Sequence, residues 1–370
     1  MKKEMKKIVL MLVALLSVTG LRAQTPTTNH IEADEVTLMP GDAETQYMPL
    51  TLVGSTIYTA YNLDVEIPEG VEVALDEGDL DVYFDQTTIM PFKKGLPLHQ
   101  IAASYFEEDR TLRISCVSTS LAEFTNNSGI LCYVGLKAAS YTKPGTLSTK
   151  LTGQNLTTKE GVKNVPADAT YNNIIIGTTG YADISVSSAN KWSTCVLPFA
   201  TALPEGVKAY TCSTKNDEEQ LFYLTEVTAL DAFTPYILYS ENGYTGTLTG
   251  TIDASQYPES GIVTGGYLTG AVEKQTTSEG YILQNKGGVV KFYVADPNLT
   301  YTIPAGKCWA TPPTSTADSF GFAIKTPTLV GGIGENDSTT TGVCYGVNGV
   351  QLTTPADGTL YIQDGKKYVK

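Results

Sequence analysis

Histidine is scarce in this sequence, and its scarcity argues against most hydrolytic chemistry. Only His30 and His99 occur among 370 residues. We place His30 in an N-terminal leader and His99 at the surface, at the start of a strand. A nucleophile activated by a base usually needs a histidine, and neither residue has a serine or cysteine motif beside it. The G-x-S-x-G, H-E-x-x-H, phosphate-loop and dinucleotide patterns are also absent, so we predict that the protein is not an enzyme.

Glycoside hydrolysis is the enzymatic alternative that these absences leave open. It needs only two carboxylates about 5 to 9 Å apart, and linear spacing does not reveal such a pair. Size argues against it, because the two halves of the chain lack helices and are shorter than the roughly 250 residues of an α/β barrel. A hydrolase is therefore the least favoured interpretation.

Long hydrophobic runs are also missing. The apolar run at residues 8–16 is shorter than the about 20 residues that span a bilayer. It follows four lysines and precedes a small residue, Ala23, ahead of Gln24. This order is typical of a secretory signal peptide over residues 1–23, cleaved between Ala23 and Gln24. The sequence thus predicts an exported protein without a transmembrane segment, in the extracellular space or on the outer cell surface.

Positive charge is in short supply. The chain has 25 basic and 39 acidic residues, a net charge of −14, which becomes −18 without residues 1–23 because five basic and one acidic side chains leave with them. Such an acidic protein repels phosphate backbones and anionic membrane surfaces. We therefore do not expect nucleic acid as a partner.

Helical periodicity is nearly absent, with residues 120–126 as the one short candidate. In residues 61–67, by contrast, Tyr, Leu, Val and Ile alternate with Asn, Asp and Glu, the period of a half-buried strand. Residues 130–138 repeat this alternation, and a hairpin turn is predicted at residues 107–109. About eight or nine such runs between residues 31 and 176 predict an antiparallel β-sandwich.

The composition of the sequence changes after residues 177–180 (Gly-Thr-Thr-Gly), with more tyrosine and glycine and shorter predicted strands. Here residues 203–210 resemble residues 303–309, each with an apolar residue, a proline, a turn glycine and a strand containing lysine and an aromatic. This similarity predicts two equivalent strands in a pseudo-symmetric sheet. The predicted fold class is all-β: a jelly-roll sandwich (31–177), a second β-rich domain (180–325), a linker (326–341) and a short C-terminal β tail (342–370) with an Asp364-Gly365 hairpin.

Six cysteines are present, and their spacing matches no zinc pattern. An even number in an oxidising compartment permits disulfides, and Cys116 with Cys132 is the pair that we single out. The alternative is that the cysteines are small buried hydrophobic residues.

An acidic run offers oxygen ligands of the kind that calcium prefers. The favoured interpretation is a solvated loop between strands, so we predict no cofactor and no metal site. The run comprises Asp76, Glu77, Asp79, Asp81 and Asp85.

The first domain resembles cohesin-type modules. The resemblance lies in residues 35–41, in the long strand at residues 58–67 that ends in Pro-Glu-Gly-Val, and in residues 129–134. It covers residues 31–176 and implies a nine-stranded jelly-roll sandwich, a fold that cohesins share with some carbohydrate-binding modules. It also implies binding of calcium-loaded dockerins or of glycans. This chain encodes no dockerin, since no Asp-rich loop has the EF-hand order of ligands.

The second domain and the tail carry a further resemblance. Residues 192–199, 234–238 and 303–307 are similar to a β-rich domain of surface proteins from gut-type Gram-negative bacteria. Residues 345–350 and 361–367 resemble a short C-terminal sorting-type sequence of the same bacteria.

Two binding functions remain. Glycan binding is the favoured one, and it predicts an exposed, coplanar row of aromatic rings on one sheet. Protein–protein adhesion or scaffolding is the alternative, and it predicts a flat apolar patch without a sugar platform. The second domain holds both tryptophans: we expect Trp192 to be buried beside an apolar strand, whereas Trp309 is compatible with either face.

Overall fold

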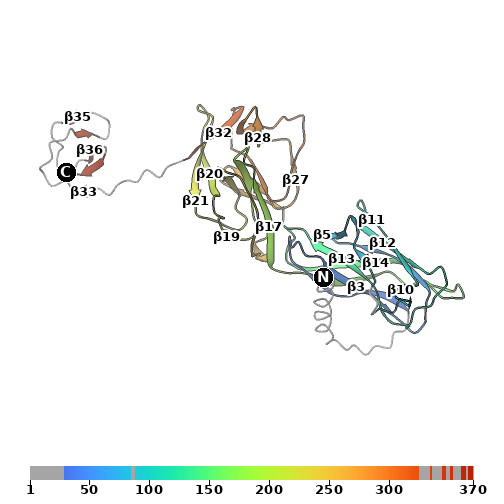
Figure 1. Ribbon diagram of the computed structural model, residues 1–370. Helices are drawn as coiled ribbons and strands as arrows, with labels where there is room; N and C mark the ends of the chain where they lie inside the picture. The colour runs from blue at the N-terminus through green and yellow to red at the C-terminus, as the bar shows by residue number, and fades with distance from the viewer. Residues whose placement is uncertain are drawn as a thin grey trace.

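The computed structural model describes residues 29–84 and 88–324, together with short strands between residues 334 and 369. Strands dominate throughout (Figure 1), and one short 3-10 turn, η1 (Ala254–Gln256), is the only helical element in the described part of the chain. The predicted all-β fold class is therefore confirmed. The signal peptide prediction, with Ala23 and Gln24, lies outside the described residues.

The short helix predicted at residues 120–126 is wrong. In its place the chain turns at Leu121, which has a φ of 52°. The Ser118 hydroxyl accepts the Ala122 N–H at 3.1 Å, and the Ser118 carbonyl accepts the Leu121 N–H at 3.3 Å. Serine side chains compete in this way with helical hydrogen bonds.

The first unit, residues 30–176, is a sandwich of two sheets. All pairs are antiparallel apart from β16 with β2. The smaller sheet has the order β1 (His30–Ala33), β3 (Gln46–Val53), β13 (Gly129–Ala138), β5 (Val71–Val73), with β8 (Val82–Tyr83) also on β13. The larger sheet has the order β11 (Gln100–Phe106), β12 (Thr111–Val117), β4 (Ala60–Glu66), β14 (Gly145–Thr157), β16 (Ala169–Ile176), β2 (Val36–Leu38), with β15 (Lys163–Asn164) on β14. Two small hairpins, β6 (Leu75–Asp76) with β7 (Asp79–Leu80) and β9 (Phe92–Lys93) with β10 (Leu96–Pro97), complete it.

Strand β4 shows why these residues form a sandwich. Tyr61, Leu63 and Val65 are buried in the core between the sheets, while the intervening polar residues face outward. Burial of each such apolar side chain stabilises the fold by about 1.5–3 kcal/mol. The alternation predicted for residues 61–67 is confirmed, as is the hairpin turn between β11 and β12.

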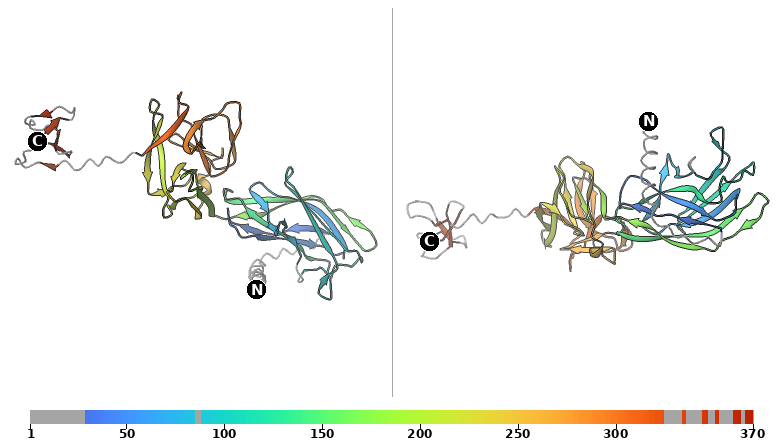
Figure 2. Two further views of the ribbon diagram at one scale, coloured as in Figure 1. Left: turned by 45° about the horizontal axis from the view of Figure 1, so that its top comes forward. Right: turned by 90° about the horizontal axis from the view of Figure 1, so that it is seen from below.

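The second unit, residues 179–324, is built on a ten-stranded sheet and lies at one end of the sandwich (Figure 2). Three two-stranded pairs accompany that sheet: β17 (Thr179–Val186) with β24 (Tyr244–Thr251), β19 (Thr201–Ala202) with β22 (Ala229–Leu230), and β27 (Gln275–Thr277) with β30 (Tyr301–Ile303). The order of the large sheet is β18 (Trp192–Cys195), β23 (Tyr236–Tyr239), β20 (Lys208–Asn216), β21 (Leu221–Val227), β32 (Ser319–Ile324), β29 (Val289–Val294), β28 (Tyr281–Lys286), β31 (Lys307–Ala310), β26 (Leu268–Ala271), β25 (Ile262–Gly265).

The two similar sequence segments occupy equivalent places in this sheet. Strand β20 is third from one end and β31 is third from the other. Each follows a tight turn closed by an N–H to proline carbonyl bond of 3.2 Å, to Pro204 and to Pro304. The turn glycines Gly206 and Gly306 have φ values of 79° and 80°, which a type II turn requires. The neighbouring strands follow in a different chain order, so the equivalence is one of position and turn, not of a tandem repeat.

Tyr141 joins the two units. Its hydroxyl donates to the Val196 carbonyl at 3.2 Å, and its own carbonyl accepts a hydrogen bond from the Tyr257 hydroxyl. The Tyr181 N–H also donates to the Pro40 carbonyl at 2.7 Å. In the described residues, no strand of one unit pairs with a strand of the other, so side chains and loops make the contact.

The C-terminal strands form a separate five-stranded sheet. Gln363 pairs with Lys366 between two antiparallel strands, as the predicted hairpin requires. One of its strands, β33, lies within residues 326–341, which were predicted to be a linker. The sequence did not indicate this strand because its parallel pairing with β37 uses backbone groups and requires no alternation of apolar residues. The order is β33 (Gly334–Glu335), β37 (Lys366–Val369), β36 (Leu360–Gln363), β34 (Cys344–Gly346), β35 (Gln351–Leu352).

Candidate functional site

The outer side of the larger sandwich sheet, here called the open face, has a regular arrangement. Its strands β11, β12, β4 and β14 place outward residues opposite one another in three cross-strand rows. Most of these side chains are small or polar. The rows are Ala102, Ser115, Asn62, Asn155; then Ser104, Arg113, Asp64, Thr152; then Phe106, Thr111, Glu66, Lys150.

Two ion pairs lie on the open face. Arg113 binds Asp64 through two bonds of 2.8 Å each, in a fork geometry that fixes both side chains. Lys150 binds Glu66 at 2.8 Å. The Arg113 side chain is 57% exposed, so the pair contributes little to stability but presents a fixed charge pattern to solvent.

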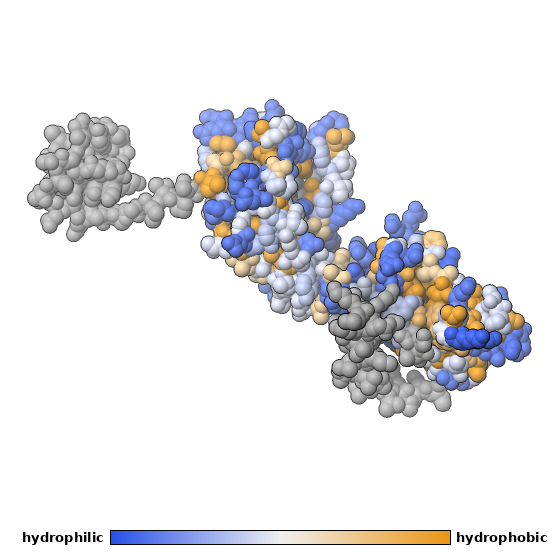
Figure 3. Space-filling model, in the orientation of Figure 1, coloured by the Kyte–Doolittle hydropathy of each residue, from blue (hydrophilic) through white to orange (hydrophobic). Residues whose placement is uncertain are grey.

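Phe106 is the exposed aromatic residue of the open face. It is 45% exposed, and every other aromatic side chain in the described residues is buried or half-buried. The Arg113 guanidinium lies 5.2 Å from its ring centroid. Figure 3 shows apolar residues at the surface of the first sandwich beside strongly hydrophilic ones. An arginine held on an aromatic ring is the composition that dominates binding energy at protein interfaces.

Strand β11 is an edge strand, because within the described residues it pairs with β12 alone. Its seven residues carry no charge and no proline. Proteins usually protect such an edge with lysine, proline or a bulge. Strand β11 therefore ends the described sheet without the usual protective residues, and the β6–β8 segment lies beside it.

The outer side of the smaller sheet, here called the tyrosine face, is different. Tyr83 stacks on Tyr133 with ring centroids 5.3 Å apart, and Tyr47 meets Tyr83 edge-on at 5.2 Å. The Tyr47 hydroxyl donates to Asp81 at 2.9 Å. These rings pack on one another and do not form a coplanar row.

The tryptophans do not form a row either. Trp192 is half-buried and meets Tyr239 and Phe322 at interplanar angles of 55° and 37°. Trp309 is buried, with 6% exposed. The geometry predicted for a sugar-stacking platform is thus not found in the described residues.

The positions predicted for His30 and His99 are wrong. His30 belongs to β1, within the sandwich. His99 is buried, with 1% exposed, and its Nε2 lies 3.0 Å from the Thr59 carbonyl, beside the Phe124 ring. Burial lowers the pKa of His99. The sequence missed this because the residue precedes β11 and follows no alternation of its own.

The Cys116–Cys132 disulfide that the sequence permits is not formed. Both thiols are free and buried in the sandwich core. Burial raises the pKa of Cys132 to about 12, which suppresses the thiolate. The alternative interpretation, small hydrophobic residues, holds for these two, for Cys195, Cys212 and Cys308.

The described part of the acidic run lies in the β6–β7 hairpin and at Asp81, just before β8. Asp76, Glu77 and Asp79 are exposed, and Asp81 accepts the hydrogen bond from Tyr47. Asp85 lies outside the described residues. No group of three metal-ligating side chains gathers in the part of the chain that is described. Nor does that part contain a helix long and apolar enough to cross a membrane.

The residues of the open face were not predicted from the sequence. Arg113 is one of only three arginines, and it occupies an outward position of an alternating strand. A rare arginine at an outward strand position was the feature of the sequence that could have indicated a binding surface. Its pairing with Asp64, 49 residues away in the sequence, could not be predicted from local pattern.

No protein-family model and no curated protein matches this chain by sequence. Several solved cohesin structures resemble it. One is a type I cohesin–dockerin complex from Clostridium thermocellum, with 13% identity, 40% of this chain and 99% of that chain covered, and a TM-score of 0.32. A non-cellulosomal cohesin from Archaeoglobus fulgidus has 15% identity, 40% and 91% coverage, and a TM-score of 0.28. A cohesin module of a Clostridium perfringens family 33 glycoside hydrolase has 12% identity, 41% and 98% coverage, and a TM-score of 0.31. Similarities at this level do not determine what this chain binds.

Proposed function

We propose that this chain is an exported, non-catalytic protein-binding module, an adhesion or scaffold component, and that its open face receives the partner. The observation that carries this proposal is the fixed Arg113–Asp64 pair beside exposed Phe106 on an uncovered sheet. Arginine and aromatic side chains are the usual centres of binding energy in protein interfaces. The surrounding small polar residues allow another surface to approach closely.

The size of the open face sets the extent of the contact. Four strands about 4.8 Å apart, with seven residues of about 3.4 Å each, cover roughly 450 Å² in projection. A standard interface buries about 800 Å² on each partner. The partner therefore contacts residues beyond these four strands as well.

The charge pattern supports specificity. The two ion pairs place positive charge on β12 and β14 and negative charge on β4 between them. This order of charges favours a partner with the complementary order. Glycan binding by the sandwich, the alternative, has less support, since within the described residues Tyr83 and Tyr133 stack on each other.

The test is site-specific photo-crosslinking in the cells that make the protein. A benzophenone amino acid replaces Phe106 in one variant and Val289 of the second unit in a matched control, since the two side chains are 45% and 50% exposed. We expect a discrete adduct from position 106 that proteases remove and glycosidases do not, and none from position 289. Equal adducts from both positions, or a glycosidase-sensitive adduct, would contradict the proposal.

A further inference from the structure

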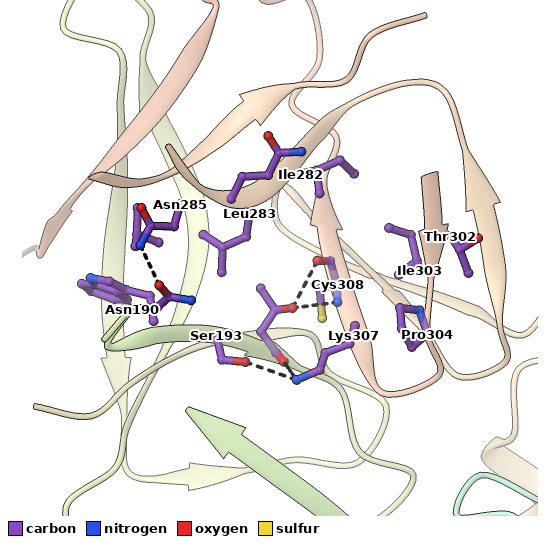
Figure 4. Close-up of a pocket in the computed structure, with 14 residues that line it drawn as sticks. Asn190, Ser193, Ile282, Leu283, Asn285, Thr302, Ile303, Pro304, Lys307 and Cys308 are labelled. Atoms are coloured by element: carbon purple, nitrogen blue, oxygen red, sulfur yellow. Dashed lines mark hydrogen bonds between the residues drawn. The ribbon is translucent and has the colours of Figure 1, made fainter. Parts of the chain in front are cut away.

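The second unit contains a cavity of about 280 Å³ between strands β18, β28 and β31 (Figure 4). Its wall has an apolar part, made by Ile282, Leu283 and Ile303, and a polar part that includes Ser193 and Lys307. The volume is at the lower limit for small-molecule sites, with room for one six-membered ring. It lies in a different unit from the open face, so its role is independent of the proposed protein binding.

The charge of this cavity is opposite to that of its surroundings. Residues 178–324 carry fourteen acidic and seven basic side chains, yet the lining of the cavity contains one lysine and no carboxylate. The cavity is therefore locally favourable to an anion within an acidic protein.

Lys307 supplies that charge. Its Nζ donates to the Ser193 hydroxyl at 3.2 Å and to the Thr194 carbonyl at 3.4 Å, both neutral acceptors. The side chain is half-buried, and among the described residues no carboxylate lies within ion-pair distance of it. Five other lysines do have such a partner: Lys150, Lys159, Lys191, Lys208 and Lys215. A half-buried ammonium without a counter-charge favours a carboxylate that arrives with a ligand.

The remaining polar groups suit hydroxyls. Asn285 bounds one side of the cavity, where its amide donates to Asn190 at 2.7 Å (Figure 4) and its oxygen accepts the Gly288 N–H at 2.9 Å. Gln284 lines the same space, and its side chain has no hydrogen-bond partner among the described residues. Amides both donate and accept, which is the chemistry that sugar hydroxyls require. Trp192 adds an aromatic surface against which C–H groups of a ring can pack.

We propose that this cavity binds a single acidic monosaccharide unit of the uronic acid class. Lys307 binds the carboxylate, the amide of Gln284 binds ring hydroxyls, and Trp192 lies against the apolar side of the ring. A neutral hexose lacks the group that Lys307 recognises, and acetate lacks the groups that Gln284 and Trp192 recognise.

The test uses tryptophan fluorescence, since Trp192 and Trp309 are the only tryptophans. Trp309→Phe in the full chain makes Trp192 the single reporter, and the variant is titrated with glucuronate, glucose and acetate. We expect saturable binding of glucuronate, with a dissociation constant on the order of 1 mM. Glucose and acetate should each bind at least about tenfold more weakly.

Lys307→Met should weaken glucuronate binding about tenfold or more, whereas the exposed control Lys208→Met should leave it unchanged. Saturation-transfer NMR on the unmodified chain gives the same comparison if Trp309→Phe does not fold. The proposal is overturned if glucuronate shows no saturable binding, if acetate or glucose binds equally well, or if Lys307→Met binds glucuronate with unchanged affinity.

Discussion

The two outer faces of the first sandwich are built from the same alternating strands and yet differ in what they expose. On the tyrosine face, Tyr47, Tyr83 and Tyr133 bury much of one another. On the open face, Arg113 holds Asp64 and lies over Phe106, and these groups remain in solvent. Outward residues therefore pack on one another or stay exposed according to which side chains the neighbouring strands place beside them.

The two arginines of strand β12 and its turn give the largest expected difference in stability. Arg110 donates to the carbonyls of Ile67, Pro68 and Val71. Arg110→Ala removes these three charge-assisted hydrogen bonds, so we expect the free energy of unfolding to fall by about 2–3 kcal/mol. Arg113→Ala removes an exposed pair and should lower it by less than about 1 kcal/mol. Urea unfolding of both variants measures the difference, and equal losses would contradict it.

A second pair of variants compares the faces themselves. Tyr133→Ala removes a stacked ring and should lower the free energy of unfolding by about 2 kcal/mol. Phe106→Ala removes a largely exposed ring and should change it by less than about 0.5 kcal/mol. Thermal unfolding followed by circular dichroism checks both. A loss for Phe106→Ala as large as that for Tyr133→Ala would make the open face a structural surface.

The next largest effect is the contribution of buried His99 to the pH dependence of the free energy of unfolding. Burial lowers its folded pKa, whereas the unfolded chain takes up a proton as pH falls through about 6.5. The unfolded state thus binds more protons in this window. We expect the free energy of unfolding to be highest above about pH 6.5 and to fall as pH drops toward the folded pKa. His99→Gln, compared with the wild type from about pH 8 to 5, should remove this slope. An unchanged slope would mean that other groups cause it.

The smallest expected effect concerns Cys116 and Cys132, which we expect not to react with an alkylating reagent in the folded protein. Cys116 and Cys132 are buried, and their raised pKa values suppress the thiolate. In the folded protein, iodoacetamide should modify neither, and in urea it should modify both. Peptide mass spectrometry after alkylation reads the two sites. Rapid modification of the folded chain would show that the sandwich core opens.

The alternation of apolar and polar residues predicted the sandwich and the inward positions of Leu63 and Val65, because burial on one face of a strand imposes a period of two. It did not predict which outward residues meet. Tyr83 and Tyr133 come from separate strands, and Lys307 reaches Ser193 across 114 residues of sequence. Such contacts depend on the strand order, which local pattern does not contain. For the same reason, the sequence suggested a coplanar aromatic row, whereas Trp192, Tyr47 and Tyr83 meet their neighbours at an angle.

The most direct test of the central claim reverses one charge on each face. Once crosslinking at position 106 has identified the partner, its affinity is measured by calorimetry for Arg113→Glu on the open face and for Lys137→Glu on the tyrosine face, where Lys137 lies on β13 four residues after Tyr133 and opposite Glu72. Arg113→Glu places two carboxylates together at Asp64, so we predict a loss of about 100-fold or more, with Lys137→Glu within about twofold of the wild type. Unchanged affinity for Arg113→Glu in a folded protein, or an equal loss for Lys137→Glu, would contradict the account.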